Sequence, residues 1–172
     1  TGADTLFGNL GNATYIVDDV NDLVTEALNE GTDTVQSSVS YTLSPNMENL
    51  ILTGPTAING IGNALNNVLT GNSAVNILTG GTGNDTYVVS SGDSILENTN
   101  EGTDTVQSDV SWSLGANLEN LTLLGGVAIS DTGNAFNNVL RGNSAVNILT
   151  GGLGNGIYVV SLGDTVVENA NE

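Results

Sequence analysis

The sequence predicts an all-β protein, a parallel β-solenoid (a β-roll or β-helix) built from repeats of about 71 residues that contain nine-residue coils. Three observations indicate this fold: a long internal repeat, a shorter repeat within it, and turn-forming glycines and asparagines spaced between single apolar residues. We expect one continuous solenoid over residues 1–172, with about 2.4 copies of the long unit and both ends falling within a unit.

The long repeat is visible in matching segments far apart in the chain. The motifs ATYIV, DTYVV and GIYVV contain Tyr15, Tyr87 and Tyr158, which are 72 and 71 residues apart. The segment EGTDTVQS occurs at 30–37 and again at 101–108. A unit that recurs at a fixed period stacks on its own copies, because one unit alone cannot bury its apolar face.

Within the long unit, nine-residue segments open with glycine and carry a large apolar residue at the eighth place. Residues 62–70, 71–79 and 80–88 read GNALNNVLT, GNSAVNILT and GGTGNDTYV, and their counterparts run from 133 to 159. Glycine and asparagine tolerate the positive φ of a tight bend, and the last three residues form a short strand with one side chain inward. The eighth-place residues that we expect in the core are Leu69, Leu78, Tyr87, Leu140, Leu149 and Tyr158.

The segments between the nonapeptides also have strand character. The segment DLVTEALNEG at 22–31 is compatible with a short helix, but its counterpart DSILENTNEG at 93–102 is a poor helix former, so we expect strand and loop in both. Period-two alternation predicts these inward-facing residues: Val35, Val39, Tyr41 and Leu43 in TVQSSVSYTL, and Leu50 and Leu52 in ENLILTG.

The charge of the chain limits its partners. There are 19 acidic residues and one basic residue, Arg141, so the formal net charge is −18. Such an excess repels itself in a compact fold, and bound divalent cations or a salt-screened acidic surface would relieve the repulsion. One arginine forms no basic patch, so we expect no nucleic-acid partner, and no stretch is apolar enough for membrane insertion.

The residue types available also argue against catalysis. The chain has no histidine, cysteine or lysine, which removes the Ser-His, Cys-His and Schiff-base mechanisms. Its carboxylates recur with the repeat, as structural positions do, whereas a single active site would interrupt the repeat. We therefore expect a protein that is not an enzyme.

The motif GGTGNDTYV at 80–88 resembles the G-G-x-G-x-D-x-U-x nonapeptide of the RTX, or haemolysin-type, calcium-binding repeats. The whole chain resembles a degenerate, asparagine-rich variant of that family from long bacterial secreted or surface proteins. The resemblance implies that calcium binds between stacked turns, through sixth-place aspartates and turn carbonyls. The sixth places here are Asp4, Ala13, Asn67, Asn76, Asp85, Asn138, Asn147 and Gly156.

Only Asp4 and Asp85 keep the charged ligand that the resemblance implies, so we expect these two to be metal positions. An asparagine turn can instead hydrogen-bond to the next coil without an ion, and Gly156 marks a turn that has lost its ion. The alternative for Asp85 is a solvated side chain in an Asx-turn. The further ligands that the resemblance implies around Asp85 are the turn carbonyls of Gly80, Thr82 and Asn84 and, one coil below, Asn67.

A second set of acidic residues recurs outside the nonapeptides. Stacking brings equivalent carboxylates together, where shared cations would relieve their repulsion; the alternative is a solvated acidic face. The set comprises Asp22, Glu26, Glu30 and Asp33, then Asp93, Glu97, Glu101 and Asp104, then Asp164, Glu168 and Glu172. The additional candidate calcium ligands among them are Asp33, Glu97, Glu101 and Asp104.

These features predict a calcium-binding structural β-solenoid module of an extracellular bacterial surface protein, adhesin or fibre. One alternative is a calcium-dependent folding and secretion module of a secreted enzyme, exported by type I secretion. The other is a calcium-independent filament subunit that associates end to end through uncapped solenoid ends. All three readings place the chain outside the cell.

Overall fold

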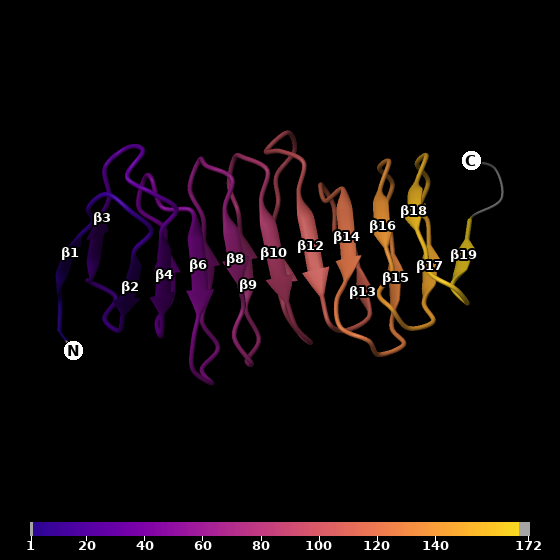
Figure 1. Cartoon of the computed structure of the whole chain (residues 1–172), viewed down its shortest axis with the longest axis horizontal. Helices are drawn as coiled ribbons and strands as arrows, with labels where there is room; N and C mark the ends of the chain where they lie inside the picture. Colours follow the sequence, from indigo (N-terminus) through magenta and orange to yellow (C-terminus); the bar gives the residue numbers. More distant parts are fainter. Residues whose placement is uncertain (1, 169–172) are drawn as a thin grey trace.

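The computed structural model describes residues 2–168, which form strands and turns and no helix. Figure 1 shows an elongated molecule in which successive coils stack along the long axis in sequence order, from indigo to yellow. Every strand pair is parallel, as expected when each coil stacks on the one before it. The predicted parallel β-solenoid is confirmed.

One side of the solenoid is a continuous parallel sheet with one strand from each of nine coils. Its strands are β2 (Thr14–Val17), β4 (Thr34–Ser37), β6 (Asn49–Leu52), β8 (Val68–Thr70), β10 (Thr86–Val89), β12 (Thr105–Ser108), β14 (Asn120–Leu123), β16 (Val139–Arg141) and β18 (Ile157–Val159).

The opposite side is divided into three parallel sheets. The divisions fall after β3 and after β11, which are equivalent points of two successive repeats. The first sheet contains β1 (Thr5–Phe7) and β3 (Leu23–Thr25); the second contains β5 (Tyr41–Thr42), β7 (Gly60–Ile61), β9 (Ile77–Thr79) and β11 (Ser94–Ile95); the third contains β13 (Trp112–Ser113), β15 (Ser130–Thr132), β17 (Ile148–Thr150) and β19 (Thr165–Val167).

The long repeat corresponds to four coils. Stacked positions are 18 residues apart between Asn67 and Asp85, 19 between Asp85 and Asp104, 15 between Asp104 and Glu119, and 19 between Glu119 and Asn138. These lengths account for the 71-residue period. The corresponding coil of the first repeat has 20 residues instead of 19, which explains the 72-residue spacing there.

A column of apolar side chains fills the interior. The eighth-place residues Leu69, Leu78, Tyr87, Leu140 and Leu149 are fully buried, as predicted, and Tyr158 is partly buried. Each pairs in register with an apolar residue of the neighbouring coil, for example Tyr87 with Leu69 below it. Apolar burial along this column is the main stabilising contribution that the sequence provides.

Two expectations for the spacers have different outcomes. TVQSSVSYTL is not one alternating strand, because the chain turns between β4 and β5, where the Ser37 hydroxyl donates to the carbonyl oxygen of Val39 at 2.7 Å. Its predicted apolar residues still face inward, although Val39 is only half-buried. The segments 22–31 and 93–102 form strand and turn, as predicted. The expectation for Glu172 falls outside the described residues.

No segment of residues 2–168 forms a helix that could cross a membrane.

Candidate metal centre

The sixth-place asparagines hold neighbouring coils together without an ion. Asn67 Oδ1 accepts the backbone N–H of Asn63 in its own turn at 2.7 Å, and Nδ2 donates to the carbonyl oxygens of Met47 and Glu48 in the preceding coil at 3.0 and 3.2 Å. An amide supplies both the acceptor and the two donors that this position uses. The residues that bond in the same way are Asn76, Asn138 and Asn147.

Asp85 occupies the same position one coil after Asn67, but its side chain has no donor. Its Oδ1 accepts the backbone N–H of Asn67 at 2.7 Å. Its Oδ2 has no hydrogen-bond partner among the described residues, although the side chain is only 1 % exposed. A buried carboxylate oxygen without a partner is costly, so this position differs chemically from the asparagine turns.

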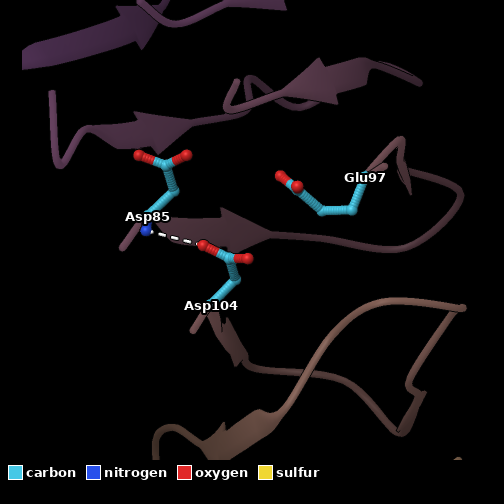
Figure 2. A group of neighbouring side chains, drawn as sticks. All are labelled: Asp85, Glu97 and Asp104. Atoms are coloured by element: carbon cyan, nitrogen blue, oxygen red, sulfur yellow. Dashed lines mark hydrogen bonds between the residues drawn. The ribbon is translucent and has the colours of Figure 1, made fainter. Parts of the chain in front are cut away.

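Two carboxylates from the following spacer lie beside Asp85. Asp85 directly precedes β10, Asp104 directly precedes β12, and Glu97 follows β11. One oxygen from each of the three lies within 4.8 Å of the others, and all three residues are buried. Figure 2 shows the three side chains and the hydrogen bond from the Asp85 N–H to Asp104 Oδ1, which is 2.8 Å long. Glu97 Oε2 also has no partner within residues 2–168.

The environment of this group disfavours negative charge. Burial, together with the charges of the neighbouring carboxylates, raises the pKa of Glu97 to about 8 and that of Asp85 to about 6. Burial also raises the pKa of Asp104. A divalent cation would neutralise the charges and supply the missing partner, and carboxylate oxygens are the ligands that calcium prefers. The residues present therefore fit a calcium ion.

A tyrosine and a glycine complete the surroundings of the group. The Tyr87 hydroxyl donates to the Glu97 carboxylate, and the backbone N–H of Gly80 also bonds to Glu97. A side chain at Gly80 would collide with Asp85 Oδ2 and with the Tyr87 hydroxyl, so any larger residue there would have to displace these two side chains. Sequence reasoning treated Tyr87 as core alone. The signal that could have found its second role is the regular Tyr-to-Glu spacing, because Tyr15 and Tyr158 bond to glutamates in the same way.

Several predicted ligands lie outside this group. Thr82 and Asn84 are exposed on the outer part of the turn, where Asn84 Oδ1 accepts the N–H of Thr103 at 2.8 Å. Glu101 lies at the rim: it shares a hydrogen bond with Glu97 and accepts one from Asn98 Nδ2, which lowers the pKa of Glu101. The structure therefore brings together the predicted Asp85, Glu97 and Asp104.

Two other predicted positions lie at a distance from these three along the chain. Asp4 is exposed, and its backbone N–H donates to Asp22 Oδ1 at 2.8 Å. Asp33 is buried and takes the place of Asp104 in the first repeat, where Ala13 stands in the place of Asp85.

A family comparison agrees with this geometry. The model of the RTX calcium-binding nonapeptide repeat matches the chain in four copies, over residues 1–23, 61–96 and 132–158. The chain belongs to the RTX calcium-binding nonapeptide repeat family. The matched RTX residues include Asp85 but neither Glu97 nor Asp104, so two of the three carboxylates come from the spacer. No curated protein and no solved structure matches this RTX chain.

Proposed function

We propose that the chain is a structural module of an extracellular protein and that Asp85, Glu97 and Asp104 hold one calcium ion inside the solenoid. The observation that carries the proposal is the convergence of three buried carboxylates, two of which have an oxygen without a hydrogen-bond partner in the described part of the chain. Membership of a calcium-binding repeat family supports calcium as the ion.

The ion would connect the turn after β11 to the continuous sheet, at a point where the opposite side of the solenoid lacks strand pairing. Asp85 and Asp104 precede paired strands of the continuous sheet, whereas Glu97 follows β11, where the opposite sheet is interrupted. A cation shared by the three side chains would fix the turn after β11 against the continuous sheet. Because the carboxylates must be ionised to bind it, ion binding and folding of this region are coupled.

The proposed biological setting is a long bacterial surface protein, adhesin or fibre. The four-coil repeat, with spacers between its nonapeptides, supports a length-building role, because repeats of this kind extend a solenoid by stacking. Extracellular calcium modules characteristically bind with affinities of roughly 10⁻⁴–10⁻³ M, which suits a site assembled from few charged ligands. The chain then acts outside the cell, after secretion, as a calcium-stabilised spacer.

The test is isothermal titration of calcium into the full chain and into Asp104→Asn. The substitution keeps the acceptor for the Asp85 N–H and removes one charge, so the expected result is a fall in affinity of at least tenfold at this site. Asp109→Asn is the matched control, because Asp109 is an exposed acid of the same spacer. Equal calcium affinity in the chain and both variants would overturn the proposal.

A further inference from the structure

We infer that the first repeat contains a second, weaker divalent-cation site formed by Glu26 and Asp33. The inference rests on the calcium site proposed for the second repeat, and it concerns residues outside the nonapeptides that the family model matches. Glu26 is 6 % exposed and Asp33 is 0 % exposed. Glu26 Oε1 and Asp33 Oδ2 have no hydrogen-bond partner among the described residues.

The hydrogen bonds around Asp33 repeat those around Asp104. The backbone N–H of Ala13 donates to Asp33 Oδ1 at 2.7 Å, as the N–H of Asp85 donates to Asp104. The Asp33 N–H in turn donates to Glu48 Oε2 at 2.7 Å. The framework is therefore the same, with the methyl group of Ala13 in place of one carboxylate.

Glu26 is held in the same way as Glu97. The Tyr15 hydroxyl donates to Glu26 Oε2, which leaves Oε1 as the oxygen without a partner. A side chain at Gly8 would collide with both carboxylate oxygens of Glu26. A glycine therefore lies against the carboxylate in this repeat too, although the nonapeptide aspartate is replaced by Ala13. The first repeat thus keeps the glutamate, its tyrosine partner and the spacer aspartate of the second-repeat site, and it lacks the nonapeptide aspartate.

The acidic groups in this region have no basic residue of their own repeat to offset their charge. Glu26, Glu30 and Asp33 all act electrostatically on the Tyr15 hydroxyl. The one basic residue of the protein, Arg141, lies in β16, in a different repeat. Hard oxygen ligands of this kind select a divalent cation such as calcium. With two carboxylates instead of three, the site binds more weakly, by tenfold or more.

The test uses terbium as the probe, because Tyr15 lies beside the site and sensitises lanthanide emission. Terbium is titrated into the full chain carrying Asp85→Asn and Asp104→Asn, which removes the stronger site. The expected result is residual saturable binding of one ion, which disappears when Glu26→Gln and Asp33→Asn are added. Absence of residual binding, or residual binding that survives the added substitutions, would overturn the inference.

A second variant tests the missing ligand directly. Ala13→Asp places a carboxylate where Asp85 stands in the second repeat, and it should raise the affinity of the residual site by tenfold or more. No change in affinity, in a variant whose circular dichroism matches the parent chain, would contradict the inference. The two proposals fail separately: unchanged binding in the Asp85→Asn and Asp104→Asn chain argues against the second-repeat site, whereas loss of all binding there argues only against the first-repeat site.

Discussion

Two stacked turns of the same edge, residues 62–67 (GNALNN) and 80–85 (GGTGND), end in an amide and in a carboxylate respectively. Both open with a buried glycine, and the backbone N–H of Asn67 donates to Asp85. The Asn67 amide is hydrogen-bonded through both its oxygen and its nitrogen, whereas one Asp85 oxygen has no hydrogen-bond partner among residues 2–168. The exchange of an amide for a carboxylate therefore decides whether a coil closes by itself or depends on a cation.

The energies involved are large enough for this difference to matter. A typical hydrogen bond contributes about 1 kcal/mol net, and an unpaired buried charge costs several kcal/mol. Dependence on calcium should therefore be uneven along the solenoid. The asparagine turns should be stable in a chelator, and the region around Asp85 should gain most when calcium is added.

The largest expected effect comes from replacing Asp85, at the end of the 80–85 turn, by the asparagine that ends the 62–67 turn. Asp85→Asn removes a charged ligand and gives the turn donors, so calcium affinity should fall on the order of 100-fold while stability in chelator rises. Calorimetry and thermal unfolding with and without EGTA measure the two effects. An unchanged calcium affinity in Asp85→Asn would contradict the distinction between the asparagine and aspartate turns.

Gly80→Ala tests the packing around the carboxylates. The new methyl group would collide with Asp85 Oδ2 and the Tyr87 hydroxyl, so the free energy of unfolding should fall by about 2–3 kcal/mol. Gly115→Ala is the control, because its nearest neighbour beyond the adjacent residues is Leu118 Cδ1 at 3.7 Å. Equal losses from denaturant unfolding of the two variants would refute the close packing at Gly80.

The pH dependence of stability should separate the apo and calcium-bound states. Folding raises the pKa of Asp85 to about 6 and that of Glu97 to about 8, above their unfolded values. In chelator, the stability that the protonated forms of these two groups contribute is complete below about pH 4 and is lost as the pH rises through 6 and 8. Calcium binding, which needs the ionised groups, should instead strengthen over the same range.

The buried Asp131 also contributes to the pH dependence of stability, independently of the three carboxylates proposed to bind calcium. It is fully buried in β15, neither carboxylate oxygen has a partner among residues 2–168, and burial raises its pKa to about 7. Asp131→Asn should therefore flatten the apo curve near pH 7, as chemical denaturation at several pH values would show. An unchanged curve would mean that Asp131 is already solvated.

The smallest expected effect is a difference between two matched asparagines. Asn67→Asp and Asn138→Asp lose the same kind of bonds to the preceding coil, but only Asn67 lies directly against Asp85, since Gly156 takes that place in the third repeat. In chelator, the first variant should be less stable than the second by about 1 kcal/mol. Calcium should remove that difference, and identical stabilities in chelator would show that Asp85 carries no charge.

Periodicity predicted the solenoid and its core because the apolar column depends on residues at fixed spacing. It also placed Asn67 below Asp85. It treated Asp85 and the spacer acids as two separate sets, because only the 19-residue step between stacked coils brings Asp104 against Asp85. Thr82 and Asn84 were expected as ligands through their turn carbonyls, and their side chains are exposed on the outer part of the turn.

Other features had no periodic signal. Asp131 stands in the core at the position that Gly60 holds one repeat earlier, so the repeat itself gives no reason to expect a buried acid there. The side opposite the continuous sheet is interrupted after β3 and after β11, within the spacers. Hydrophobic alternation does not determine where such interruptions fall.

The most direct test of the account is a crystal structure of the chain grown with calcium, with an anomalous difference map to locate the ions. The account predicts a strong peak between the carboxylates of Asp85, Glu97 and Asp104, and none at the asparagine turns. A peak on the outer turn beside Thr82 and Asn84, with no density between the three carboxylates, would contradict it.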